Sequence, residues 1–335
     1  MDYMKHIVEA LSILQQRDLI EKQPFKARAY STIIKQLKQL NKPIHVYEDL
    51  QGIAGIGEKI EQKIKEILAT GHLQSAERVK EEYHTESLKA FQQIYGVGPA
   101  KAKELVEQGF KTIADLRANP QTLNDKQKIG LMYYEDLLER IPRAEMDQHK
   151  EILYEHLPAD MVFESEIVGS YRRGAQTSGD IDILLKATQT SMTQTTQPKQ
   201  TKQTKQLQDF VTVLHTEGYI LEILAIGAHK CMAICQLPGQ KARRLDILIV
   251  SDTEYAYSLL YFTGSDLFNI AFRQHCISKG YTLNEHTLLS ATVIIPSMAS
   301  EKDIFTFVGL RYVTPCERVD ARQIVPLRVR PQVAR

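Results

Sequence analysis

Three aspartates lie in two apolar stretches of the chain, and their spacing could support phosphoryl chemistry. Asp180 and Asp182 are two residues apart in a run typical of a β-strand, so both side chains should point to the same face. Asp246 lies in a second strand-like run, residues 243–250. Three carboxylates can hold two divalent ions, one activating an attacking hydroxyl and the other binding a triphosphate. Any one of these aspartates alone would more simply be a strand-end or turn carboxylate.

A glycine-rich segment, residues 169–174 (Gly-Ser-Tyr-Arg-Arg-Gly), directly precedes the first two aspartates. Its glycines and Ser170 would bring backbone N–H groups close to a polyphosphate, and Arg173 could bind the same charge through its planar guanidinium group. Arg244, next to Asp246 in sequence, could hold a DNA primer or orient the carboxylates. The combination predicts a nucleotidyltransferase site that uses two Mg²⁺ ions, for which Mn²⁺ can substitute.

Two glycine hairpins recur in the first third of the chain, which has the apolar periodicity of helices. Residues 53–57 (Ile-Ala-Gly-Ile-Gly) and 94–98 (Ile-Tyr-Gly-Val-Gly) each precede a predicted helix. Such a turn leaves N–H groups at a helix N-terminus, where they can bind DNA phosphates without reading bases. One hairpin alone could simply join two packed helices, but two favour non-specific DNA binding. The glycines that permit the tight turns are Gly55, Gly57, Gly96 and Gly98.

Lys59 and Lys63 follow the first hairpin and lie four residues apart, on one face of the predicted helix. Two ammonium groups so close disfavour each other's charge, which favours a neutral and nucleophilic amine. Without the hairpin beside them, the simpler interpretation is a solvated lysine face.

These motifs resemble those of the X family of DNA polymerases, from about Phe25 to about Phe307. The resemblance implies an α+β multidomain protein that is a template-directed, gap-filling DNA polymerase of base excision repair and also a 5′-deoxyribose-phosphate lyase. Its substrates would be gapped or nicked DNA and dNTPs, and other repair proteins would be partners. The implied domains are a helical lyase domain (1–81), a helical DNA-binding subdomain (82–142), a palm with a mixed β-sheet (143–252) and a nucleotide-selecting subdomain with a basic tail (253–335).

The resemblance also assigns residues to the lyase site and to the hairpins. Lys63 would form a Schiff base with the abasic sugar, supported by Lys26, Tyr30 and Lys59. Backbone carbonyls in each hairpin would hold K⁺ or Na⁺ between protein and phosphate. The six residues that would supply them are Gln51, Ile53, Ile56, Gln92, Ile94 and Val97.

The incoming nucleotide would be bound from two segments, again by resemblance. The triphosphate would contact Arg140, Ser170, Arg173, Ser178, Gly179 and Asp180. The sugar and base would contact Tyr261, Phe262, Gly264, Asp266 and Asn269, and Arg273 would reach the template strand.

Four positions depart from the family pattern. Ile270 stands where the family has a lysine that stacks on the template base, and Leu248 stands where it has an arginine. These changes bear on fidelity and on closure of the enzyme, not on the chemistry. His72 and Ser75 replace further lysines, which leaves the strength of the lyase activity open.

Composition predicts an intracellular protein with two to four cores, since the 335 residues are 43% hydrophobic and 25% charged. No apolar run approaches a membrane span and no signal peptide begins the chain. The location would be the nucleus in a eukaryote, although a viral or cytoplasmic setting also fits, and we expect a monomer. Cys231 and Cys235 read as buried apolar thiols of a strand in preference to zinc ligands.

The net charge of only +1 means that DNA affinity must come from local patches. The last 25 residues carry six arginines, and we interpret this end as a solvated basic face or tail. The six are Arg311, Arg318, Arg322, Arg328, Arg330 and Arg335. Residues 188–206, almost entirely Thr, Gln and Lys, predict a mobile loop.

Two other functions stay open. One is template-independent terminal nucleotidyl transfer, or addition to RNA, and the other is a non-catalytic scaffold that binds DNA gaps.

Overall fold

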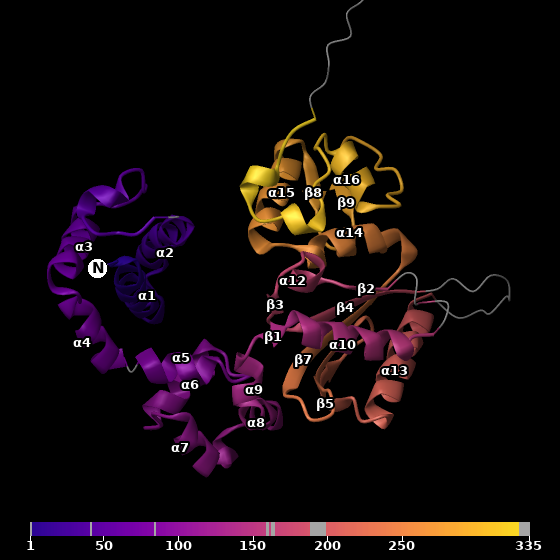
Figure 1. Ribbon diagram of the computed structural model, residues 1–335, viewed down its shortest axis with the longest axis horizontal. Helices are drawn as coiled ribbons and strands as arrows, with labels where there is room; N and C mark the ends of the chain where they lie inside the picture. The colour runs from indigo at the N-terminus through magenta and orange to yellow at the C-terminus, as the bar shows by residue number, and fades with distance from the viewer. Residues whose placement is uncertain are drawn as a thin grey trace, which may run out of the picture. The chain divides into compact units, whose positions relative to one another are not determined.

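The computed structural model describes residues 2–40, 42–83, 85–158, 161, 165–187 and 199–327. The chain forms two compact units, Met1–Tyr134 and Glu135–Arg335, which we describe separately (Figure 1). The first unit is helical in its described residues, and the second combines a mixed β-sheet with helices. This confirms the predicted α+β multidomain class. None of the helices in the described ranges is long and apolar enough to cross a membrane.

The first half of the helical unit is built around two long helices that lie side by side (Figure 1). Their apolar residues recur three and four apart, as in Ile7, Leu11 and Leu14, and are fully buried against Ile33 and Leu37. The elements are α1 (Met4–Ile20), α2 (Pro24–Gln39), the 3₁₀ turn η1 (Tyr47–Leu50), α3 (Glu58–Thr70) and α4 (Gln74–Tyr83).

The second half of this unit has its own small core, centred on Phe91, Ile94 and Leu105. Helix α8 approaches the second hairpin so closely that a Cβ at Gly130 would lie 2.5 Å from the Tyr95 carbonyl oxygen. Only glycine fits there. The elements are α5 (Thr85–Gln92), α6 (Pro99–Glu107), α7 (Ile113–Ala118), η2 (Pro120–Thr122), α8 (Asp125–Met132) and α9 (Tyr134–Leu138), the last crossing into the second unit.

A five-stranded mixed sheet organises the second unit, with strand order β2-β4-β7-β6-β5. The central strands β4 and β7 run parallel, and the other neighbours are antiparallel. The strands are β2 (Glu166–Ile167), β4 (Ile181–Lys186), β5 (Ile220–Ile226), β6 (Lys230–Gln236) and β7 (Ala242–Val250). Two further pairs are β1 (Ile141–Pro142) with β3 (Thr177–Ser178), and β8 (Tyr281–Leu283) with β9 (Leu288–Ser290).

Helices cover both faces of this sheet, so the side chains of β4 and β7 alternate between two cores. Ile183 and Ile247 belong to the core under α10 (Arg143–Glu155) and α13 (Lys199–Thr216). Leu184 and Leu248 belong to the core under α14 (Asp252–Thr263). Asp182 and Asp246 directly precede Ile183 and Ile247, whose side chains lie in the core under α10 and α13. The two aspartates therefore point to the opposite face of the sheet, which α14 covers.

The C-terminal part of the unit packs three phenylalanines, Phe268, Phe272 and Phe305, in contact with one another. Its elements are α14, α15 (Asp266–Ser278), α16 (Glu301–Phe307) and the short turns η3 (Pro315–Glu317) and η4 (Ala321–Gln323), while α12 (Gly169–Arg172) is a single turn between β2 and β3.

The predicted mobile loop 188–206 is wrong from Lys199 onward, because α13 begins there. Lysine and glutamine are good helix formers, and the apolar residues Leu207, Phe210 and Leu214 further along the helix anchor it to the sheet. Residues 188–198 lie outside the described ranges.

The boundary between the units falls after Tyr134, before the predicted boundary at 142/143. Residues 135–142 belong to the second unit through Asp136, which accepts a hydrogen bond from the Ala242 backbone, and through Glu139, which forms an ion pair with Lys241.

The expectation of a solvated basic tail is wrong for Arg318, which is only 1% exposed. Its guanidinium group donates to Glu301 at 2.5 Å and lies over the rings of Phe268 and Phe305. A buried arginine of this kind is stable because its charge is paired. Arg328, Arg330 and Arg335 lie outside the described residues. Cys231 and Cys235 are buried in β6, as predicted.

His149 in α10 makes the stability of this unit sensitive to acid. Its Nδ1 lies 2.8 Å from the Tyr219 hydroxyl, and burial lowers the pKa of His149 to about 4. Between these two pKa values the unfolded chain therefore binds a proton at His149 and the folded protein does not. We expect the free energy of unfolding to fall as the pH drops from about 6.5 towards 4, by roughly 3 kcal/mol. His149→Gln should reduce the loss of unfolding free energy between pH 7 and pH 4, measured by urea denaturation.

The control is the same substitution at His215, which is exposed on α13 and should leave the acid sensitivity unchanged. If His149→Gln and the wild type lost equal stability on acidification, the buried imidazole would not be the acid-sensitive group.

Candidate active site

Asp182 and Asp246 face each other across the two parallel strands, as direct register partners in β4 and β7. Asp180 immediately precedes β4, and the charges of Asp180 and Asp246 both act on Asp182, so the three predicted carboxylates lie near one another around these two strands. Burial and the neighbouring charges of Asp180 and Asp246 raise the pKa of Asp182 to about 7. Carboxylates gathered in this way repel one another, and the site therefore favours a bound cation.

Two basic side chains form ion pairs with these carboxylates in this structure. Arg244 forms an ion pair with Asp180, and the Lys230 Nζ lies 2.7 Å from Asp246 Oδ2. Within the described ranges, no three His, Cys, Asp or Glu side chains converge closely enough to hold a metal ion. The buried Asp246 Oδ1 nevertheless has no hydrogen-bond partner. A buried carboxylate with an orphaned acceptor, beside two half-buried carboxylates, fits Mg²⁺, which prefers hard oxygen ligands.

The glycine-rich segment lies directly beside these carboxylates. Gly169 adopts a left-handed φ of +62°, and a Cβ there would lie 3.0 Å from Asp182 Oδ2. Ser170 donates a hydrogen bond to Ser178 at 3.0 Å. Arg140 binds the Thr177 hydroxyl and carbonyl, both at 2.7 Å. Gly169 thus lets the backbone lie close to Asp182, which the sequence did not indicate, and the approach of this segment to a polyphosphate stays a prediction.

These residues form one wall of a cleft of about 660 Å³. The other wall comes from the end of α14 and the start of α15. Of the residues predicted to contact the nucleotide, only Ser178 does not line the cleft; it is buried and accepts the hydrogen bond from Ser170. The lining residues are Arg140, Gly169, Ser170, Arg173, Gly179, Asp180, Asp182, Tyr261, Phe262, Gly264, Asp266, Asn269, Ile270 and Arg273.

The second wall is held together by its own contacts. The Tyr261 and Phe262 rings pack edge to face, 4.9 Å apart. Asn269 donates to the Tyr261 carbonyl at 2.7 Å, and the Arg273 guanidinium lies over the Tyr261 ring and 3.5 Å from Glu285. Asn269, predicted to contact the nucleotide, and Arg273, predicted to reach the template strand, are thus both held against Tyr261.

Thr263 connects the two walls and was missed by sequence reasoning. Arg172 donates to its hydroxyl and Arg173 to its carbonyl, both at 2.6 Å. Gly264 follows with φ +64°, and its would-be Cβ lies 3.2 Å from Arg173 Nη1. A threonine at a helix end gives no sequence signal for this role.

The predicted lyase residues lie on two helices of the first unit, α2 and α3, that contribute to the same hydrophobic core. Lys59 and Lys63 are one turn apart on α3, with Lys63 half-buried and its Nζ donating to the Lys59 carbonyl at 3.3 Å. Lys26 is exposed on α2, whereas Tyr30 on the same helix is buried, and burial raises the pKa of its hydroxyl.

Both hairpins have the predicted geometry. Gly55 and Gly96 adopt left-handed φ values of +91° and +82°, which favour glycine. Gly57 and Gly98 are the N-caps of α3 and α6. Among the residues named for cation binding, Ile94 and Val97 are buried, and Ile53 and Ile56 pack against the first core.

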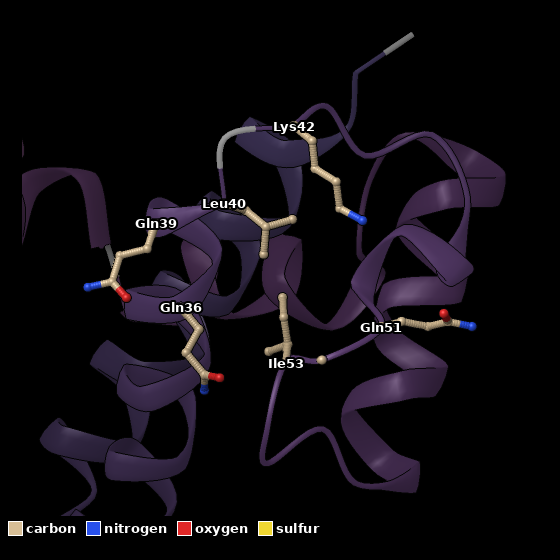
Figure 2. A pocket seen from close by; sticks show the side chains of 7 residues that line it. Gln36, Gln39, Leu40, Lys42, Gln51 and Ile53 are labelled. Carbon is tan, nitrogen blue, oxygen red and sulfur yellow. The ribbon is translucent and has the colours of Figure 1, made fainter. Parts of the chain in front are cut away.

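A glutamine side chain holds each hairpin, which the sequence did not indicate. Gln36 accepts a hydrogen bond from the Ala54 N–H at 2.9 Å and donates to its carbonyl at 3.0 Å. Gln127 donates to the Gly96 carbonyl at 2.9 Å. Figure 2 shows the groove beside the first of these contacts, with Gln36 and Gln39 from α2 on one side and Ile53 on the other.

Gln36→Leu should loosen the first hairpin, because two hydrogen bonds to one residue of the turn are lost. We expect a loss of about 1 kcal/mol in local stability and weaker binding to gapped DNA by about threefold to tenfold. Hydrogen exchange at residues 52–57 and fluorescence anisotropy at fixed salt would measure the two effects. Gln39→Leu is the control, since Gln39 lines the same groove but makes no hydrogen bond to the described hairpin. Equal effects of the two variants would refute the role of Gln36.

Comparison with known domain families gives four matches in succession along the chain. They are a helix-hairpin-helix domain over residues 3–73, the fingers domain of DNA polymerase lambda over 89–138, the DNA polymerase beta palm over 140–252 and the DNA polymerase beta thumb over 258–319. The palm match contains all three predicted aspartates.

Similar whole proteins are also polymerases. The chain is 32% identical to DNA polymerase lambda of Rattus norvegicus, over 95% of this chain and 56% of the relative. It is 30% identical to DNA polymerase lambda of Arabidopsis thaliana, over 87% of this chain and 57% of the relative. The human DNA-directed DNA/RNA polymerase mu is 28% identical, over 92% and 68%. The chain thus spans a little over half the length of the polymerase lambda relatives.

Proposed function

Because the chain belongs to the X family of DNA polymerases, as its four successive domain matches show, we propose that it is a template-directed, gap-filling DNA polymerase of base excision repair. The observation that carries the proposal is the pairing of Asp182 with Asp246 across β4 and β7, beside the cleft that Gly169 and Arg173 line. Acidic residues lie next to basic and glycine-rich ones there, as transfer of a nucleotide from a triphosphate requires.

The three aspartates would act on the two reacting ends of the substrates. Two Mg²⁺ ions held by Asp180, Asp182 and Asp246, or Mn²⁺ in their place, would activate the primer 3′-hydroxyl and neutralise the triphosphate. Asp246 would face the hydroxyl and help to remove its proton. The hydroxyl oxygen bonds to the α-phosphorus, the bond from that phosphorus to the β-phosphate breaks, and pyrophosphate leaves.

The remaining cleft residues would bind and select the nucleotide. Arg140, Ser170, Arg173, Ser178 and Gly179 would position the triphosphate, with Ser178 acting through Ser170. On the other wall, the sugar would lie against Tyr261, Phe262 and Gly264, which would exclude a 2′-hydroxyl. Asp266 would pack on the base, Asn269 would contact the minor-groove edge, and Arg244 and Arg273 would bind primer and template.

We propose a second activity for the first unit, the removal of a 5′-deoxyribose phosphate. The Lys63 amine would add to the sugar aldehyde with loss of water, and β-elimination would then break the bond between the sugar and the DNA 5′-phosphate. Lys26, Tyr30 and Lys59 would bind around the abasic end. The hairpin carbonyls of residues 51, 53, 56, 92, 94 and 97 would hold K⁺ or Na⁺ against the DNA backbone. A nuclear site of action, other repair proteins as partners and a monomeric state also belong to this proposal.

Single-nucleotide insertion tests the polymerase proposal. The substrate is a one-nucleotide-gapped duplex with a 5′-phosphate, incubated with Mg²⁺ and each dNTP in turn, beside an unpaired primer. We expect template-matched insertion that depends on the gap. Insertion on the unpaired primer would favour terminal transfer, and no insertion would favour the non-catalytic scaffold. Ribonucleotides belong in the same assay, because one relative is named a DNA/RNA polymerase.

A further inference from the structure

Lys230 contacts the candidate active site from a strand that carries no catalytic motif. β6 pairs antiparallel with β7, so that Met232 lies opposite Asp246 and Lys230 lies opposite Leu248. Lys230 therefore projects from the same face as Asp246 and reaches it diagonally. The Nζ–Oδ2 distance is 2.7 Å.

Asp246 depends on this contact in the structure. Its side chain is only 8% exposed, and Lys230 is the sole hydrogen-bond donor to it among the described residues. Arg244 Nε is 3.9 Å from Asp246 Oδ1, and neither atom has a hydrogen bond. A buried carboxylate without a partner strongly destabilises a fold, so Lys230 compensates for the burial of Asp246.

The same ammonium group stands in the way of a metal ion. Coordination at Oδ2 would displace Lys230 directly, because an ammonium group donates hydrogen bonds and cannot be a ligand. Coordination at Oδ1 would place two positive charges within a few ångströms of each other. A divalent cation and the Lys230 ammonium therefore compete for Asp246 at either oxygen.

Lys230 can leave this position without breaking the fold. Its side chain is 43% exposed, and lysine carries its charge on a long flexible stem. The neighbouring Arg243 differs in this respect, because it is buried and holds Glu145 through two hydrogen bonds of 2.6 and 2.9 Å. Of these two cations, only Lys230 has the freedom to exchange with a metal ion.

We propose that Lys230 is a resident counter-cation of the polymerase site, which stabilises Asp246 in the metal-free protein and is displaced when the divalent metal binds. Lys230 thereby sets the metal concentration at which the site becomes competent. This inference rests on the proposed two-metal function and adds a residue that controls metal entry.

Metal binding by Lys230→Met, Lys230→Gln and wild type tests the inference. Mn²⁺ binding to the full chain, without DNA or nucleotide, is measured by isothermal titration calorimetry, and melting temperatures are recorded in EDTA. Lys230→Met should bind Mn²⁺ about tenfold more tightly, because one nearby positive charge is gone. It should also melt at a lower temperature in EDTA. Lys230→Gln should share the tighter binding with a smaller fall in melting temperature, because an amide donor remains.

Lys241→Met is the matched control. Lys241 is similarly exposed and forms an ion pair with Glu139, which is not in the cleft. It should leave both Mn²⁺ affinity and melting temperature unchanged. Equal or weaker Mn²⁺ binding by the Lys230 variants, with clear binding by wild type, would overturn this inference alone. A wild-type chain that binds no Mn²⁺ would instead overturn the proposed two-metal function, and the inference with it.

Discussion

Asp182→Asn should reduce nucleotide insertion by about a thousandfold or more while leaving affinity for gapped DNA unchanged. Asp182 is the carboxylate with both other aspartates as neighbours, and Gly169 brings the backbone of the glycine-rich segment against it. Removing its charge takes away a carboxylate that would hold the metal ions, and the loss of such a group lowers the rate of the chemical step. Single-turnover insertion and anisotropy binding on the same gapped duplex separate the two effects.

Stability gives an independent measurement on the same variant. Asp182 is half-buried beside like charges, so asparagine relieves repulsion and should leave the melting temperature equal or higher. Asp209→Asn is the control, since Asp209 is exposed on α13, which packs on the other face of the sheet. Insertion retained in Asp182→Asn would place the metal ligands elsewhere. A lower melting temperature together with lost DNA binding would instead mean that Asp182 has a structural role.

The strand that carries Asp182 could be predicted from its sequence pattern, whereas Asp180, expected on the same strand, lies just before it. The partnership of Asp182 with Asp246 could not be predicted, since the register of β4 against β7 joins positions 64 residues apart and is set by the apolar residues that both strands bury. The same holds for the layering of helices on the two faces. Local periodicity identified the strands, and long-range packing decided how they pair.

Polar residues were the main source of missed or wrong expectations. Arg318 was expected in solvent and is buried, because Glu301 at the start of α16 supplies its charge partner. Lys230 and Gln36 had no motif, and each acquires its role from a partner on a different element. A charged or amide side chain is equally compatible with solvent and with a buried partner, and only the fold brings that partner near. The tight turns at Gly55 and Gly96, in contrast, are local features and were predicted from sequence.

Lys63→Ala should abolish covalent trapping on a 5′-deoxyribose-phosphate end by borohydride, while leaving gap-filling insertion in the wild-type range. Only a primary amine that forms a Schiff base can be trapped in this way, and Lys63 lies half-buried on α3 beside the Lys59 carbonyl. Insertion should persist because the predicted polymerase residues all belong to the second unit. Lys63→Arg should lose trapping as well, since it keeps the positive charge but lacks a nucleophilic amine.

The control for this prediction lies on the same helix. Lys65 is exposed, pairs with Glu61 at 2.7 Å and should trap normally when changed to alanine. Trapping that survives in Lys63→Ala but disappears in Lys59→Ala would move the nucleophile by one helical turn. Trapping that survives in both would remove α3 from the chemistry, because the two lysines share the helix face on which the prediction depends. Loss confined to the Lys63 variants would identify the amine and show that the two activities reside in separate units.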